Sequence, residues 1–289
     1  MSNNKNNKKA KKPDPVNPRS IMVQKVAVIV VGIILIVTVL YFAGYIPHPS
    51  ISKSSQPAFT APTSIPWGSF TEISNQNFAG SGAENIYFIT WVGCPIGASI
   101  SWSLNYTLSH YQGVSNIKTD GHYSDPNEKE EIASLPGLLF LDSLSYTSSI
   151  TGAKVSFYPV YMYNETLFAY ASNNTAISQS DLVSAGMSVV NSSVPSGIAS
   201  LVYKYTNLVN ISNLSPYTPS AFLSNPNHMN TVLVITGSFG TYMLNGQLYP
   251  PAYIHGISYK DLEGAQADGF SGYPYIATGA QTIESILSK

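Results

Sequence analysis

Residues 84–102 read ENIYFITWVGCPIGASISW, and this stretch decides the fold that we expect. Residues 84–92 are apolar, β-branched and aromatic over the length of a strand, which predicts a buried strand. Gly93-Cys94-Pro95 ends that strand, and Pro95 suits the first turn of a helix. Apolar side chains then recur at helical spacing over residues 97–111, which predicts an amphipathic helix. The stretch therefore predicts a strand–turn–helix unit with Cys94 at the turn.

Further strands are predicted downstream of this unit. Residues 136–141 (PGLLFL) form a short run with the composition of a buried segment. Residues 154–163 (KVSFYPVYMY) predict a strand, in which Pro159 marks an edge or a bulge because proline cannot donate to a central ladder. Residues 231–235 and 241–244 are joined through glycines, which predicts a β-hairpin.

Helices are predicted between and after these strands. Residues 177–206 show helical spacing that is interrupted around Pro195, so we expect one or two helices there. Capping boxes that begin at Ser258 and Thr278 predict the starts of the last two helices. The order of elements predicts an α/β fold, a mixed sheet covered by helices, with a helical insertion at about 177–228.

The composition excludes several classes of protein. Only 10% of the residues are charged and 44% are hydrophobic, which excludes a disordered polar chain. The cations gather near the N-terminus, and no arginine follows Arg19. Because nucleic-acid binding needs clustered Lys and Arg to neutralise phosphates, we expect no nucleic-acid partner.

An uncharged segment near the N-terminus predicts where the protein lies. Residues 26–46 (VAVIVVGIILIVTVLYFAGYI) reach about 30 Å as a helix, the thickness of one bilayer core. A buried core helix and a cleaved signal peptide are the alternatives, but a secretory apolar region is shorter, roughly 7–15 residues. We therefore expect a single transmembrane helix that anchors the chain in membrane lipid, with the cation-rich N-terminus in the cytoplasm.

This anchor divides the chain into four expected parts. A basic cytoplasmic tail (1–25) precedes the transmembrane helix, and a Pro- and Ser-rich stalk (47–67) follows it. Residues 68–289 then form an extracytoplasmic domain. The expected localisation is the cell membrane, with the C-terminal domain outside. A low-charge surface in that position suits an acidic exterior, since few ion pairs would be lost on protonation.

Sequons in the predicted outer domain are candidates for N-glycosylation. The candidates are Asn164, Asn173, Asn191, Asn210 and Asn213. A sixth sequon, at Asn105, is the doubtful one because it falls inside the predicted helix.

Cys94 is the place where chemistry is expected. The free N–H groups and the dipole of a helix N-terminus stabilise a thiolate, which lowers a thiol pKa below about 8.5. Cys94 is the only cysteine in the chain, so no internal disulfide can form. The segment WVGCPIGASISW resembles a thioredoxin-type Trp-x-Gly-Cys-Pro-x-Cys site, with Trp91, Gly93 and Pro95 shaping it and Gly97 in place of the second cysteine.

A wider resemblance covers most of residues 68–289. The chain resembles the archaeal family catalogued as domain of unknown function 929, in which many relatives carry Cys-Pro-x-Cys at this place. That resemblance implies a thioredoxin-like fold and no established activity. The matching segments, in order along the chain, are GCPIGASISW (93–102), HYSDP (122–126), PGLLF (136–140), VYMYN (160–164) and YPPAYIHGISY (249–259).

Two departures from the thioredoxin pattern direct the functional prediction. Gly97 cannot resolve a mixed disulfide, and Asn230-Thr231 stands where a cis-proline would precede the strand facing the cysteine. We therefore expect a non-catalytic binding or scaffold module of the cell envelope, with an envelope protein as partner. A monothiol redox protein or disulfide chaperone acting through Cys94 is the alternative, and an envelope structural protein is a third. We expect no cofactor, and the histidines lack metal-ligand spacing.

Overall fold

The computed structural model describes residues 59–127 and 133–289. The expected cytoplasmic tail, the transmembrane helix at 26–46 and the stalk up to residue 58 lie outside the described residues. Within the described part, no helix is both long enough and apolar enough to cross a membrane.

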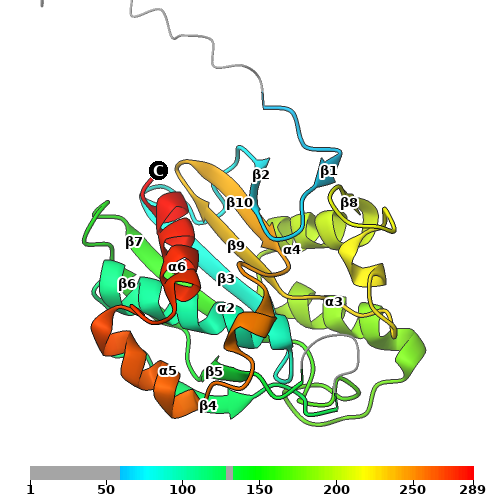
Figure 1. The fold of residues 1–289 in the computed structure, drawn as a ribbon. Coiled ribbons are helices and arrows are strands. Elements are labelled where there is room, and N and C mark those ends of the chain that lie inside the picture. The colour runs from blue at the N-terminus through cyan, green and yellow to red at the C-terminus, as the bar shows by residue number, and fades with distance from the viewer. Residues whose placement is uncertain (1–58, 128–132) are drawn as a thin grey trace, which may run out of the picture. The chain divides into compact units, whose positions relative to one another are not determined.

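A six-stranded mixed sheet forms the centre of the domain, which confirms the predicted α/β class (Figure 1). β3 is parallel to β7, and every other neighbouring pair in this sheet is antiparallel. The parallel pair is possible because a long crossover that contains α2 joins the two strands. In spatial order the strands are β2 (Phe70–Ser74), β10 (Gly240–Asn245), β9 (Val232–Gly237), β3 (Ala83–Thr90), β7 (Lys154–Tyr161) and β6 (Leu144–Thr147).

Two small sheets lie beside the central one. β1 (Ser64–Ile65) pairs in parallel with β8 (Asn210–Ile211), and Ile65 is buried. The folded domain therefore begins before Gly68, and the last residues of the expected stalk belong to it. β4 (Thr119–Tyr123) pairs with β5 (Pro136–Phe140). The sequence predicts no strand at β4, because its TDGHY composition is that of a loop.

α2 (Pro95–Tyr106) continues as a π-helical turn, η1 (Thr107–Tyr111), and lies on one face of the sheet beside α6 (Pro274–Leu287) (Figure 1). Every residue of α2 is buried, so the predicted helix is confirmed but its predicted amphipathic character is wrong. The sheet covers one side of α2, while α6 and β5 cover its other sides. Its serines satisfy their hydroxyls on backbone carbonyls, as Ser103 does on Ile276 at 2.8 Å.

The opposite face of the sheet carries the predicted helical insertion. α3 (Leu182–Ser193) and α4 (Ser196–Tyr203) are separated at Pro195, as the sequence predicts, and a π-helical turn, η3 (Lys204–Leu208), follows α4. Figure 1 shows this helical layer on the side of the sheet away from α2 and α6. Phe78 packs against Gly197 of α4 and donates its backbone N–H to Thr236 of β9 at 3.0 Å.

The remaining turns and helices test the other predictions. The β9–β10 hairpin is confirmed, and Pro159 lies on β7 beyond Phe157, where the pairing with β6 ends. Ser258 caps α5 (Tyr259–Ala265) by accepting the Asp261 N–H. The last helix begins at Pro274 and not at Thr278, because Pro274 supplies the favoured first position. Short 3₁₀ turns are Gln179–Asp181, Ser220–Phe222, Pro251–Ile254 and Gln266–Asp268.

Candidate functional site

Cys94 lies at the N-terminal end of α2, as the sequence predicts. Its Sγ accepts a hydrogen bond from the Gly97 N–H at 3.3 Å, so the thiol itself caps the helix. The same sulfur lies 3.0 Å from the Thr231 hydroxyl, which comes from the residue just before β9. Only 2% of Cys94 is exposed to solvent. A bulky disulfide substrate therefore has no direct access to the sulfur in this conformation.

Two threonine hydroxyls occupy the space next to the thiol. Thr231 Oγ1 lies 2.7 Å from Thr90 Oγ1, and together with Cys94 they form a buried polar chain. A Cβ atom on Gly97 would overlap the Thr90 hydroxyl. The position of the missing second cysteine is therefore closed to any side chain unless Thr90 moves.

Backbone segments from other parts of the chain cover the turn that carries Cys94. A Cβ on Gly93 would overlap the carbonyl oxygen of Glu165. The backbone at Glu165 therefore lies directly against the turn. Val92 donates its N–H to the Tyr163 carbonyl at 3.0 Å, and Gly93 accepts the Asp125 N–H at 2.9 Å. The turn is held on both sides by main-chain hydrogen bonds, which is the environment of a packed core.

His122 adds a buried imidazole to this cover. Its Nε2 lies 2.6 Å from the Val92 carbonyl, and since a carbonyl only accepts, Nε2 carries the proton. Desolvation lowers the pKa of His122, which keeps the ring neutral. The proton-bearing nitrogen is thus committed to the backbone and is not available to activate the thiol.

The segments that carry the family resemblance converge on this unit. VYMYN supplies Tyr163, HYSDP supplies His122 and Asp125, and both bind the turn described above. In PGLLF, the Pro136 carbonyl accepts the Trp102 indole N–H at 3.0 Å. In YPPAYIHGISY, the Tyr249 hydroxyl donates to the Ser99 carbonyl at 2.6 Å. The motifs that are far apart in the sequence therefore share one structural task, which is to enclose α2 and its N-terminal turn.

All five residues expected to form the site lie together at the turn, and all five are buried. Trp91 stands edge-on to His228, with ring centroids 5.9 Å apart. Pro95 occupies the first position of α2. Sequence reasoning missed the contacts of Thr90, which lies in no motif, and of His122, which was noted only as part of the HYSDP segment. It did single out the Asn230-Thr231 position for its lack of proline, although not for the contact that Thr231 makes.

The sequons differ in their exposure. Asn105 is buried within α2, which excludes it from modification in the folded domain. Asn173, Asn191 and Asn213 are exposed, whereas Asn164 and Asn210 are half-buried. The Asn213 side chain also binds both the N–H and the carbonyl of Trp67.

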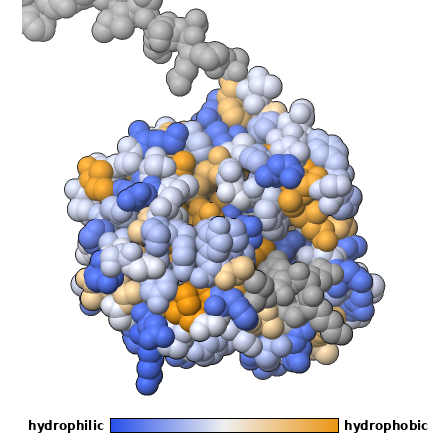
Figure 2. Space-filling view, viewed as in Figure 1, coloured by the Kyte–Doolittle hydropathy of each residue, from blue (hydrophilic) through white to orange (hydrophobic). Residues whose placement is uncertain are grey.

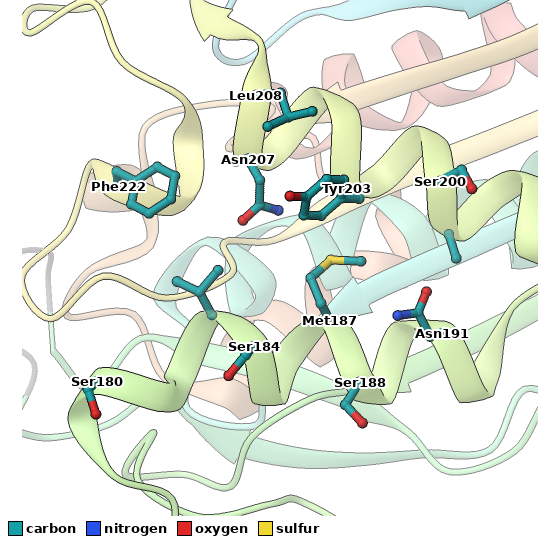
Figure 3. Close-up of a pocket in the computed structure, with 12 residues that line it drawn as sticks. Ser180, Ser184, Met187, Ser188, Asn191, Ser200, Tyr203, Asn207, Leu208 and Phe222 are labelled. Atoms are coloured by element: carbon teal, nitrogen blue, oxygen red, sulfur yellow. The ribbon is translucent and has the colours of Figure 1, made fainter.

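A second feature is an open groove between α3 and α4, on the other side of the sheet (Figure 3). Its volume is about 890 Å³, and no charged residue lines it. Three exposed apolar side chains project at its rim: Tyr203 (47% exposed), Leu208 (61%) and Phe222 (42%). Figure 2 shows apolar surface on this α4 side of the molecule. The polar side chains that complete the groove are Ser180, Ser184, Ser188, Asn191, Ser200 and Asn207.

Neither feature gathers metal ligands. Across residues 59–127 and 133–289, no three His, Cys, Asp or Glu side chains lie close enough together to hold a metal ion.

Comparison with known proteins gives one match. The model of the family described as Domain of unknown function (DUF929) matches residues 69–289, which covers most of the chain and every described strand except β1. No curated protein and no solved structure matches the chain.

Proposed function

The chain belongs to this family of unknown function, and from that premise we propose that it is a membrane-anchored, extracytoplasmic binding or scaffold module of the cell envelope. The domain is a thioredoxin-like fold whose redox site is degenerate and non-catalytic. Residues 26–46 anchor it in the membrane, and the cation-rich N-terminus faces the cytoplasm. The partner is a protein of the same envelope.

The topology supports the thioredoxin-like part of the proposal. A β–α–β unit (β3, α2, β7) has parallel strands, and a β–β–α unit (β9, β10, α6) adds an antiparallel hairpin beside β3. This gives the order β7-β3-β9-β10 at the centre of the sheet, with α2 and α6 together on one face. Cys94 then follows the first strand, and Thr231 precedes the strand that faces it, as in a thioredoxin-type site.

The observation that carries the non-catalytic role is the closure of the second cysteine position. Dithiol exchange requires a second thiol to resolve the mixed disulfide. Gly97 has no side chain, and the Thr90 hydroxyl fills the space into which one would extend. Since Cys94 is also enclosed, its local role is to cap α2 and to pack against β3 and β9.

The α3–α4 groove supports the binding role, because it is the described surface that combines a hollow with exposed aromatic and aliphatic side chains. Its lack of charge favours a partner segment that is itself uncharged and partly apolar. Tyr203 at the rim is the expected anchor, since tyrosine is enriched among residues that dominate binding energy.

The alkylation rate of Cys94 tests the enclosed state. In the full-length chain, we expect native Cys94 to react at least about a hundredfold more slowly than in urea, because reaction requires local opening. Cys94→Ser is the blank, and Ser143→Cys in that background is an exposed-thiol control. A native rate equal to that of the control, with an apparent pKa well below about 8.5, would overturn the non-catalytic role.

Site-specific photo-crosslinking tests the groove. A crosslinking side chain at Ser200, which lines the groove, is compared with one at Ser143, an exposed residue just before β6 that does not line it. We expect an adduct with one envelope protein from Ser200 and none from Ser143. In the Ser200 background, Tyr203→Ala should reduce the yield about tenfold, which corresponds to about 1.4 kcal/mol of binding. Equal adducts from both positions would contradict a groove-specific partner.

The monothiol redox protein is the second candidate, and one observation favours it. The Gly97 N–H and the Thr231 hydroxyl both contact Sγ, and hydrogen bonds of this kind stabilise a thiolate. A protein trapped on Cys94 as a mixed disulfide in the envelope, and absent from Cys94→Ser, would establish this role in place of the first.

A further inference from the structure

A cluster of buried polar side chains lies at the end of the sheet farthest from Cys94. Glu84 on β3 and Tyr146 on β6 both stand beside Val155 of β7, so the three side chains form one row on the same face of the sheet. Glu284 of α6 and Gln112, just after η1, close over that face and bind each other, with Gln112 Nε2 donating to Glu284 Oε2 at 2.8 Å. Thr151 donates to Glu84 Oε1 at 3.3 Å.

Four residues of this cluster each leave one buried atom without a hydrogen-bond partner among the described residues. The atoms are Glu84 Oε2, Glu284 Oε1, Gln112 Oε1 and the Tyr146 hydroxyl. Exposure is 4% for Glu84, 8% for Glu284 and 3% for Gln112. A buried polar atom without a partner destabilises the fold, and does so more strongly when it is charged. Four such atoms from four separate segments of the chain therefore indicate that something is missing from the cluster.

The missing components are hydrogen-bond donors. If both carboxyl groups are ionised, three of the four atoms are oxygens that only accept, and the Tyr146 O–H is the single donor. A proton on each carboxyl converts two of the acceptors into donors. A protonated Glu284 can then return a hydrogen bond to Gln112, which forms the cyclic pair typical of a carboxylic acid and an amide.

The charges around the pair favour the same state. Burial is the largest cause that raises the pKa of Glu84 and of Glu284, and Glu284 raises the pKa of Glu84 further. Burial and both carboxylates also raise the pKa of Tyr146, the third titratable group of the cluster. No cation in the described part of the chain is among the groups that shift either carboxyl. Two ionised carboxylates in this position would therefore lack any counter-charge.

We propose that Glu84 and Glu284 form an interior proton-binding site, in which both side chains are neutral carboxylic acids and stabilise the folded domain in acid. The protons come from bulk water, and no other bond changes. Because the folded-state pKa values are raised, this stabilisation is complete below the unfolded pKa, near 4.5, and is lost as the pH rises through the folded-state values. The inference is independent of Cys94 and of the groove.

The test is the unfolding of the full-length chain against pH, followed by tryptophan fluorescence. All three tryptophans lie within residues 59–289, so the signal reports this domain. Glu284→Gln mimics the protonated acid. At pH 7 we expect the unfolding temperature of the variant to lie about 3 °C above that of the native chain, which corresponds to about a tenfold shift in the unfolding equilibrium. At pH 4 we expect the two proteins to unfold at the same temperature. Glu263→Gln on exposed α5 is the matched control, with no difference at either pH.

Other titrating groups do not obscure this result. His122 has a lowered pKa, so it stabilises the domain above its unfolded value and loses that contribution as the pH falls. It is present in both proteins and cancels from their difference. Glu284→Gln that is less stable than the native chain at pH 7 would overturn the inference, because it would show that the ionised form is the one required.

Two further measurements keep the inference falsifiable if Glu284→Gln fails to fold. Glu84→Gln should also unfold at a higher temperature than the native chain at pH 7, and this difference should disappear as the pH falls to 4. Infrared spectra of the native chain at pH 6 should contain a protonated-carboxyl band that Glu84→Gln reduces. If Ca²⁺ or Mg²⁺ at pH 7 raises the stability of the native chain as much as acid does, and leaves Glu84→Gln unchanged, a cation neutralises the pair and the inference is wrong.

Discussion

The two faces of the sheet carry opposite kinds of surface. On the α2 side, every residue of the helix is buried and the turn at Cys94 is enclosed by segments from three other parts of the chain. On the α3–α4 side, the two helices leave a groove with exposed Tyr203 and Leu208 at its rim. The residue with the most reactive chemistry therefore lies where access is least. The open surface lies in the insertion, which has no reactive motif.

The largest expected loss of stability comes from adding a methyl group at the tightest backbone contact on the α2 side. Gly93→Ala places a methyl group on the Glu165 carbonyl, which is backbone and cannot rotate away. We expect a loss of about 4 kcal/mol or more in the free energy of unfolding, measured by denaturant titration. Gly264→Ala is the control, since that glycine lies on α5 with open space around it, and it should stabilise the domain by up to about 1 kcal/mol.

Restoring the second cysteine tests the same face more gently. Gly97→Cys must displace the Thr90 hydroxyl, so we expect a loss of about 1–3 kcal/mol and little disulfide with Cys94. Adding Thr90→Ala should recover part of this loss, because the two sites share one space. A Gly97→Cys chain of native stability that forms the disulfide quantitatively would show that the α2 side is not closed.

These two glycines also show how far the sequence can be interpreted. The strand–turn–helix unit was predictable because its signals are local: an apolar run, a Gly-Cys-Pro turn and helical spacing. The burial of α2 was not, because it depends on α6 and β5, which are distant in sequence. Thr90 and His122 escaped prediction for the same reason, since a hydroxyl or an imidazole acquires its role only from what the fold places beside it.

A smaller effect is expected from the polar chain at the thiol. Thr231→Val keeps the shape of the side chain but removes the hydroxyl that Thr90 and Cys94 share. We expect a loss of about 1–2 kcal/mol in stability, because two buried polar groups lose a partner. Thr282→Val on α6, where the hydroxyl makes only a local bond to Thr278, should change stability by about 0.5 kcal/mol or less. If Thr231→Val and Thr282→Val lower the free energy of unfolding by the same amount, the hydrogen bonds among Cys94, Thr231 and Thr90 contribute nothing specific to stability.

The smallest effect on stability is expected in the groove, and this contrast separates the two faces. Tyr203 is nearly half exposed, so Tyr203→Ala should change the free energy of unfolding by about 0.5 kcal/mol or less, while it weakens crosslinking from Ser200. Tyr249→Phe on the α2 side should do the reverse. It removes a buried hydrogen bond to Ser99, which costs about 1 kcal/mol, and leaves the groove unchanged. If Tyr249→Phe also abolishes the crosslink, the two faces are coupled, and the groove cannot be treated as a site separate from the enclosed helix.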